Sequence, residues 1–216
     1  HLTYDPVRGL SPVSLVALYP LILVVPNVMP VRTVAEFIEY AKAHPDLPCG
    51  TSGAGSPQHL CGTVFGTRTG ASFNYVHYRG GAPAVSDMLS GQLQVLFAPL
   101  PEALTHVQGG SFRALAVTGT TRSALLPDVP TVAETLPGYD MPMWNAMFVP
   151  AGTPQPIIDR LSREVASVLQ MPDVRQKFIE GAFEPVGNTP AELDQFRTAE
   201  LPRWAEIVRD SGATLD

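Results

Sequence analysis

The sequence predicts an α/β fold with a mixed, largely parallel sheet, and two observations favour it. Short apolar runs typical of strands alternate with longer amphipathic stretches typical of helices. Apolar residues make up 45% of the 216 residues, which is enough for one large domain or two small lobes with real cores. In such a sheet, ligands bind at the carboxyl ends of the strands, next to the helix N-termini.

Six apolar runs are predicted to form strands. The longest apolar stretch lies around residues 21–25 between Pro20 and Pro26, and is far too short to span a membrane, so it indicates a buried strand. The six runs are Val13–Leu18, Leu21–Val25, Phe73–His77, Leu93–Phe97, Arg113–Val117 and Met143–Val149.

Three capping boxes predict helix starts. In each, a threonine is followed three residues later by a glutamate, and the two side chains satisfy backbone N–H groups of the first turn. They begin at Thr33, Thr131 and Thr189, and Pro190 strengthens the third because proline suits the first helical position. Two apolar stripes at helical spacing are predicted to face a core. Their members are Ile157, Ile158, Leu161, Val165, Val168 and Leu169, and then Leu193, Phe196, Trp204, Ile207 and Val208.

The charge pattern excludes several partners. Charged residues are 16% of the chain, the net charge is −6, and Lys42 and Lys177 are the only lysines. No basic surface for nucleic acid and no basic amphipathic helix for a membrane surface is encoded. Any anion must therefore be bound by local dipoles.

Cys49 and Cys61 support neither a disulfide framework nor a tetrahedral metal site. They are interpreted as two small buried residues, with a bond between them as the alternative. No metal and no cofactor is predicted.

The segment 47–60 is the one most typical of a binding site. A strand ends near Thr51, a glycine-rich turn follows, and a helix begins with Ser56 as its cap and Pro57 at its first position. Gly53 and Gly55 allow close approach of a ligand to the backbone. Free N–H groups of this turn and the hydroxyls of Thr51, Ser52 and Ser56 would form a cradle for a carboxylate.

Other interpretations of this segment remain open. Gln58 replaces the third glycine of a dinucleotide fingerprint, and Ala54 replaces the last glycine of a nucleophile elbow. His59 could act as a base for Ser52, but no acidic residue lies nearby in the sequence. The turn could also connect a strand and a helix without binding anything.

A similar turn, Tyr78–Pro83, follows the next strand, and its Gly80 and Gly81 precede a helix. Arg79 is either an anion clamp or a solvated side chain. Phe97 and Trp144 lie at the end and the start of predicted strands, where they would line a cleft or pack in the core.

Seven motifs, in order along the chain, resemble the Bug-type substrate-binding proteins of tripartite tricarboxylate transporters. They are Tyr4–Arg8, Ser11–Ser14, Gly53–Leu60, Tyr78–Ala84, Arg113–Thr118, Pro127–Glu134 and Pro150–Pro154. The resemblance implies a periplasmic-binding-protein type II fold with two lobes. Residues 20–143 would form a complete second lobe, and residues 1–19 with 144–216 the remnant of an incomplete first lobe.

The resemblance also implies a function. The protein would be periplasmic, would capture a small carboxylate or dicarboxylate for a membrane permease, and would not be an enzyme. The alternatives are a ligand-sensing module acting on a partner protein and, least favoured, a serine hydrolase using Ser52. The residues implied to bind the ligand are Thr51, Ser52, Gly53, Gly55, Ser56, His59, Tyr78, Gly80, Gly81, Ala82, Tyr19, Phe97 and Trp144.

Two departures from the family pattern matter. Ala98 and Pro99 stand where many relatives carry an aspartate or asparagine that can receive an amino group, which disfavours a ligand ammonium. The chain also opens about a third of the way into the family pattern, N-terminally truncated relative to it. We therefore expect the remnant lobe to expose an apolar face or sheet edge that favours self-association.

Overall fold

The computed structural model describes residues 5–211, so Tyr4 of the first family-like motif lies outside the described part. The chain divides into two compact units, each described below by itself. The smaller contains the described residues up to Leu18 and Trp144–Ala205, and the larger contains Tyr19–Met143 and the described residues from Glu206 to Ser211. The predicted lobes differ from these units at residue 19 and after residue 205.

The larger unit is built on a mixed sheet with strand order β3-β2-β4-β1-β5. β2 pairs in parallel with β3 and β4, whereas β1 runs antiparallel to β4 and β5. The predicted α/β class with a mixed sheet is therefore confirmed. The strands are β1 (Leu10–Pro26), β2 (Leu47–Thr51), β3 (Phe73–His77), β4 (Val95–Pro99) and β5 (Phe112–Val117).

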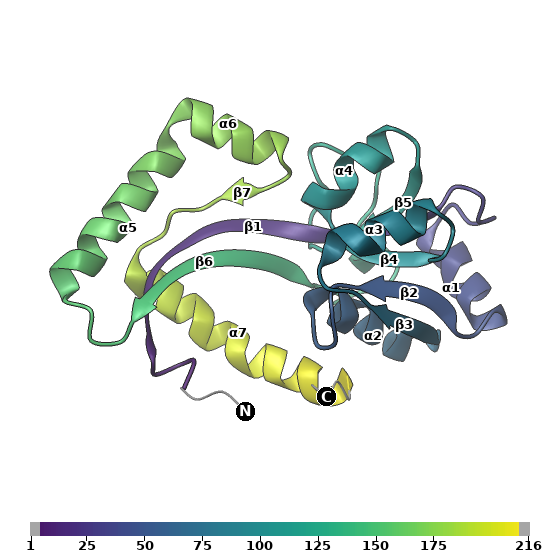
Figure 1. Ribbon diagram of the computed structural model, residues 1–216, viewed down its shortest axis with the longest axis horizontal. Helices are drawn as coiled ribbons and strands as arrows, with labels where there is room; N and C mark the ends of the chain where they lie inside the picture. Colours follow the sequence, from purple (N-terminus) through teal and green to yellow (C-terminus); the bar gives the residue numbers. More distant parts are fainter. Residues whose placement is uncertain (1–4, 212–216) are drawn as a thin grey trace. The chain divides into compact units, whose positions relative to one another are not determined.

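Four helices flank this sheet. Because β3 and β4 lie on opposite sides of β2, right-handed crossovers place the two connecting helices on opposite faces. Figure 1 shows this arrangement, with α3 above the strands and α2 below them. The helices are α1 (Val34–Ala43), α2 (Pro57–Thr69), α3 (Gly81–Leu89) and α4 (Leu100–Gln108). Thr33 forms the predicted capping box at the start of α1.

The core of the larger unit is aromatic and aliphatic. Phe65 of α2 is completely buried, and its ring centre lies 5.8 Å from that of Phe37 and 5.6 Å from that of Phe97. Residues 21–25 are all buried as predicted, but Pro20 does not interrupt the strand, so two predicted strands form the single β1. Cys49 and Cys61 are both buried and no disulfide joins them, which confirms the first interpretation and rejects the second.

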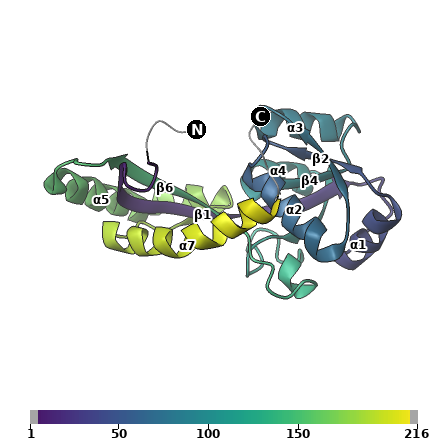
Figure 2. The ribbon, with the colours of Figure 1, turned by 90° about the horizontal axis from the view of Figure 1, so that it is seen from below.

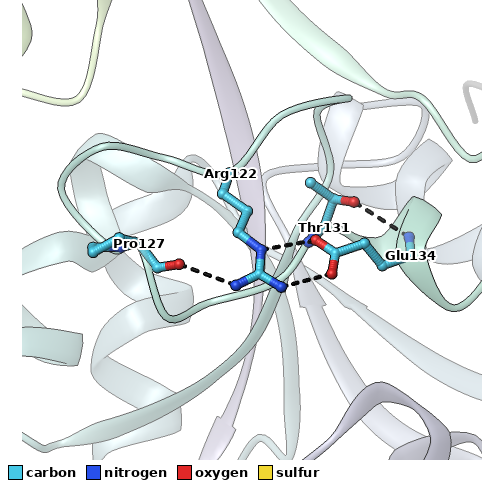
Figure 3. Close-up of polar contacts among 4 residues, drawn as sticks. All are labelled: Arg122, Pro127, Thr131 and Glu134. Carbon is cyan, nitrogen blue, oxygen red and sulfur yellow. Dashed lines mark hydrogen bonds and ion pairs between the residues drawn. The ribbon is translucent and has the colours of Figure 1, made fainter.

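A clamp fastens the loop between β5 and β6 (Pro142–Pro150). Figure 3 shows the Arg122 guanidinium donating to both carboxylate oxygens of Glu134, at 2.9 and 2.7 Å, and to the Pro127 carbonyl at 3.1 Å. Thr131 and Glu134 form the predicted capping box. The helix that follows is only the 3₁₀ turn η1 (Val132–Glu134), so this box begins a much shorter element than a typical α-helix.

The smaller unit combines part of β1 and most of β6 with β7 (Glu184–Pro185) and three helices. Both β6 and β7 pair with β1, and β7 does so in antiparallel register. Figure 2 shows α7 running along this part of β1. The helices are α5 (Gln155–Gln170), α6 (Pro172–Glu180) and α7 (Pro190–Ser211), and the Thr189 capping box precedes α7 as predicted.

The smaller unit has a thin core. It holds only six of the buried apolar residues, and seven of the exposed large ones. The prediction that the whole apolar stripe of α5 faces a core is therefore wrong in part, since Ile157 and Val168 are 49% and 47% exposed. The same prediction for α7 is wrong at Val208, which is also exposed. α5 contacts α6, the helix that follows it directly in the chain. The exposed residues are Val7, Met147, Ile157, Val168, Met171, Ile179 and Leu201.

No helix within residues 5–211 is both long enough and apolar enough to cross a membrane.

Candidate functional site

A small hollow, partly open to solvent, lies at the carboxyl ends of β2 and β4, where α2, α3 and α4 begin. Four residues predicted from the sequence line it, namely Thr51, Ser52, Gly81 and Phe97. The other lining residues are Gly50, Gln58, Ala84, Val85, Leu96, Ala98, Pro99 and Glu102. All of these belong to the larger unit.

The glycine-rich turn differs from the prediction. The expectation that its free N–H groups face an empty space is wrong for Gly53, Gly55 and Ser56, because the protein itself satisfies all three. Gly53 N–H donates to Thr51 Oγ1 at 3.2 Å, and Gly55 N–H donates to His59 Nδ1 at 3.1 Å. Ser56 N–H donates to the Gly53 carbonyl at 3.1 Å. None of these three residues, nor His59, lines the hollow.

Three other N–H groups remain available at the hollow. Within the described residues, no hydrogen bond involves the backbone N–H of Ser52, Gln58 or Gly81. Gln58 and Gly81 lie in the first turns of α2 and α3, where the helix leaves N–H groups without an internal acceptor. If an anion binds here, the two helix starts, rather than the glycines of the turn, would supply the donors that favour it.

The side chains of Ser52 and Gln58 are joined. The Ser52 hydroxyl donates to Gln58 Oε1 at 2.8 Å, which leaves the Gln58 NH₂ group as a further donor. This bond also removes the basis for a serine nucleophile. His59 cannot serve as its base, because its Nδ1 accepts from Gly55, and no His or acidic side chain in residues 5–211 bonds to Ser52.

Behind the turn lies a polar cluster that holds it in place. The Thr51 hydroxyl is bonded to His77 Nδ1 at 2.6 Å. The His59 ring lies edge-on to those of Tyr75 and His77, with ring centres 4.5 and 5.0 Å apart. Burial and then the neighbouring His77 lower the pKa of His59, so the neutral ring that accepts from Gly55 is favoured. His59 is thus a positioning residue in this structure.

The second turn is fixed by Tyr78. Its hydroxyl donates to Asp87 Oδ2 at 2.6 Å, and desolvation together with Asp87 raises the pKa of Tyr78 to about 12. Gly80, the N-cap of α3, has φ +108°, a conformation that favours glycine. Tyr78, Gly80 and Ala82 flank the hollow without lining it, and Arg79 is exposed and does not line it.

Two predicted residues lie on the long strands. Tyr19 is on β1, and burial and then the charge of Glu102 raise its pKa. Trp144 is on β6 in the smaller unit, where its ring lies edge-on to Phe196 with centres 5.7 Å apart. Neither lines the hollow.

Glu102 and Gln58 also line the hollow, and neither was predicted from the sequence as a site residue. Glu102 lies in the first turn of α4, which begins directly after β4, and partial burial of its carboxyl group raises its pKa. An acidic residue after Pro101 is an ordinary helix-start signal, and it could have predicted α4. Among the described residues, no group of three or more His, Cys, Asp or Glu side chains could hold a metal ion.

A family model described as "Tripartite tricarboxylate transporter family receptor" matches residues 1–213. Protein BugT of Bordetella pertussis is 36% identical over 98% of this chain. A solved structure of R. palustris Rpa4515 with adipate has a TM-score of 0.93 and 34% identity, covering 99% of this chain and 72% of that one. MatC from Rhodopseudomonas palustris with bound malate has a TM-score of 0.87 and 28% identity, covering 96% and 72%.

The match covers this chain more fully than it covers the relatives. The chain spans 66%, 62% and 63% of the length of three curated relatives, the first of which is BugT.

Proposed function

The chain belongs to the tripartite tricarboxylate transporter receptor family, and from this premise we propose that it captures a small carboxylate or dicarboxylate in the hollow at the ends of β2 and β4. The family is one of substrate-binding receptors and not of enzymes. One observation supports the proposal above the others. Two helices begin at the same hollow with unbonded N–H groups, at Gln58 and Gly81, and this arrangement favours a negative group.

The relatives narrow the class of ligand. One neighbour has been solved with adipate and another with malate, and both are small dicarboxylates. The proposed ligand would place one carboxylate against Ser52, Gln58 and Gly81. The protein would act in the periplasm and deliver this ligand to the membrane permease of a tripartite transporter. Self-association through the exposed apolar residues of the smaller unit is also proposed.

A thermal-shift screen against mono- and dicarboxylates, including adipate and malate, tests the proposal. A ligand at a hundredfold excess over its dissociation constant adds about 2.7 kcal/mol to the free energy of unfolding. For a chain of this size, that corresponds to a rise in Tm of about 5–11 °C. Gln58→Ala should reduce the shift, because it removes a side-chain donor at the hollow and the partner of Ser52.

Gln108→Ala is the matched control, since this exposed glutamine of α4 makes no side-chain hydrogen bond in the described residues. It should leave the ligand-induced shift unchanged. The proposal fails if no carboxylate raises Tm, or if Gln58→Ala and Gln108→Ala respond alike.

A further inference from the structure

One feature of the hollow does not suit a simple anion site. Glu102 is the only titratable side chain among the lining residues. The residue as a whole remains accessible to solvent, but its carboxyl group loses part of its hydration inside the hollow. It contributes a negative charge at the place where the proposed ligand would bring another.

The carboxylate lies directly against the start of α3. A methyl group added to Gly81 would collide with Glu102 Oε2, so the carboxylate and the unbonded Gly81 N–H share one small region. No lysine, arginine or histidine within residues 5–211 forms an ion pair with Glu102. The charge is therefore not neutralised by the protein.

No other titratable group competes for this role. The lining residues from β2, α2, α3 and β4 are apolar or neutral, and the titratable group that faces Glu102 from β1 is the neutral Tyr19 hydroxyl. Partial burial raises the pKa of Glu102, as expected for a carboxyl group without a cationic partner. A second ionised carboxylate beside it would be repelled unless one of the two took up a proton.

We propose that Glu102 is a specificity-determining residue, which requires the ligand to present a hydrogen-bond donor beside its captured carboxylate. This inference rests on the proposed function. The N–H groups of Ser52, Gln58 and Gly81 hold the ligand carboxylate, and Glu102 accepts from a hydroxyl or an ammonium group on the same ligand. The site then has a positive and a negative side, and a 2-hydroxy or 2-amino acid has both complementary groups on adjacent carbons.

This inference changes one expectation from the sequence. Ala98 lacks the acidic or amide side chain that the family resemblance implies at this position, which disfavours a ligand ammonium there. Glu102 follows shortly afterwards in the first turn of α4, and it brings a carboxylate into the same hollow. A site that bonds a polar ligand group through a buried or partly buried partner discriminates strongly against the analogue that lacks it.

Three probes with one carbon skeleton test the inference: succinate, malate with a 2-hydroxyl group, and aspartate with a 2-ammonium group. Their dissociation constants are measured by isothermal titration with the wild-type chain and with Glu102→Gln. In the wild type, malate or aspartate should bind about tenfold or more tightly than succinate, since hydrogen bonds to charged groups are strong. Preference for malate identifies a hydroxyl as the donor, and preference for aspartate identifies an ammonium.

In Glu102→Gln this preference should fall to about threefold or less, because succinate gains affinity when the repulsion is removed. Succinate binding to the wild type should also take up a proton, so its affinity rises as the pH falls below neutral, and the variant should lose most of this dependence. Glu39→Gln, an exposed acid on α1, is the control and should change neither result. A melting curve of each variant verifies folding.

The outcomes separate the two proposals. If the probes bind but Glu102→Gln leaves their ratios within about twofold of the wild type, the role of Glu102 is refuted and the proposed function stands. If no carboxylate binds either protein, the proposed function fails, and the inference fails with it.

Discussion

Replacing Thr51 by valine tests whether the end of β2 holds the binding turn in place. The Thr51 side chain is 1% exposed, and its hydroxyl is bonded to His77 Nδ1 at 2.6 Å. The same oxygen accepts from Gly53 N–H at 3.2 Å. Valine has a methyl group where threonine has its hydroxyl, so the substitution removes these bonds with little change in the volume of the side chain.

The expected loss follows from counting the bonds that one hydroxyl can make. The hydroxyl donates its single hydrogen to His77 Nδ1 or, where that nitrogen carries its own hydrogen, to the Gly53 carbonyl at 3.3 Å, and in both cases it accepts from Gly53 N–H, so at least one donated and one accepted bond are lost. Each contributes about 1 kcal/mol net. Because Gly53 is only partly buried, its released N–H can reach water, and no large additional cost arises. Thr51→Val should therefore lower the free energy of unfolding by about 2 kcal/mol.

Urea denaturation of the purified chain measures this change, with Thr105→Val as the control. Thr105 is exposed on α4 and its hydroxyl makes no hydrogen bond in residues 5–211, so Thr105→Val should change the free energy of unfolding by no more than about 0.5 kcal/mol. Ligand affinity should also fall in Thr51→Val, since Thr51 lines the hollow. A stability change for Thr51→Val no larger than that of the control would refute the idea that this hydroxyl fixes the turn.

Two further substitutions test electrostatic features of the fold. The pKa of His59 is lower in the folded chain than in the unfolded chain, so the unfolded chain binds a proton at higher pH and the free energy of unfolding should fall as the pH drops below about 6.5. His59→Asn should reduce this pH dependence, measured by urea unfolding at several pH values. His44→Asn, at an exposed histidine, is the control and should leave it unchanged. An identical pH profile for wild type and His59→Asn would contradict the buried neutral state. Arg122→Ala should raise the pKa of Glu134 from about 2 toward its ordinary value of about 4.5, because Arg122 is the main cause of the shift. Carbon NMR titration of the Glu134 carboxyl measures this, and an unmoved pKa would show that the Thr131 capping bonds are sufficient alone. The ionised Glu134 carboxylate contributes fully to folding stability above its pKa in the unfolded chain, and this contribution is lost as the pH falls through its folded pKa of about 2.

Local chemistry made much of the larger unit predictable. Phe73–His77 is a strand with the predicted bounds, and the caps at Thr33 and Ser56 begin helices as expected. These features depend on neighbours within a few residues, which a sequence displays directly. The prediction that Pro20 separates two strands is wrong, because β1 continues through it. Proline has no backbone N–H, but it can lie within a strand at a position where the neighbouring strand does not need that hydrogen bond.

The site was predicted less well than the fold, because its hydrogen bonds join groups whose positions depend on the fold. The sequence shows glycines between a strand and a helix, but not that His59 turns back to accept from Gly55 or that Thr51 accepts from Gly53. Glu102 lies more than forty residues beyond that turn, and only the parallel pairing of β2 and β4 brings its helix start to the same hollow. Neither composition nor residue spacing predicts that pairing.

The charges of this protein make the local arrangement decisive for its function. A chain with a net charge of −6 repels anions at long range, so an anionic ligand gains affinity only from donors that it meets within the hollow. Those donors are few: the backbone N–H groups of Ser52, Gln58 and Gly81, and the NH₂ of Gln58. Glu102 offsets part of their attraction for any ligand that is negative at every polar position. A ligand that also carries a hydrogen-bond donor is not repelled by Glu102 but donates a hydrogen bond to it. This difference in binding free energy, rather than the electrostatic field of the whole protein, can distinguish one small acid from another.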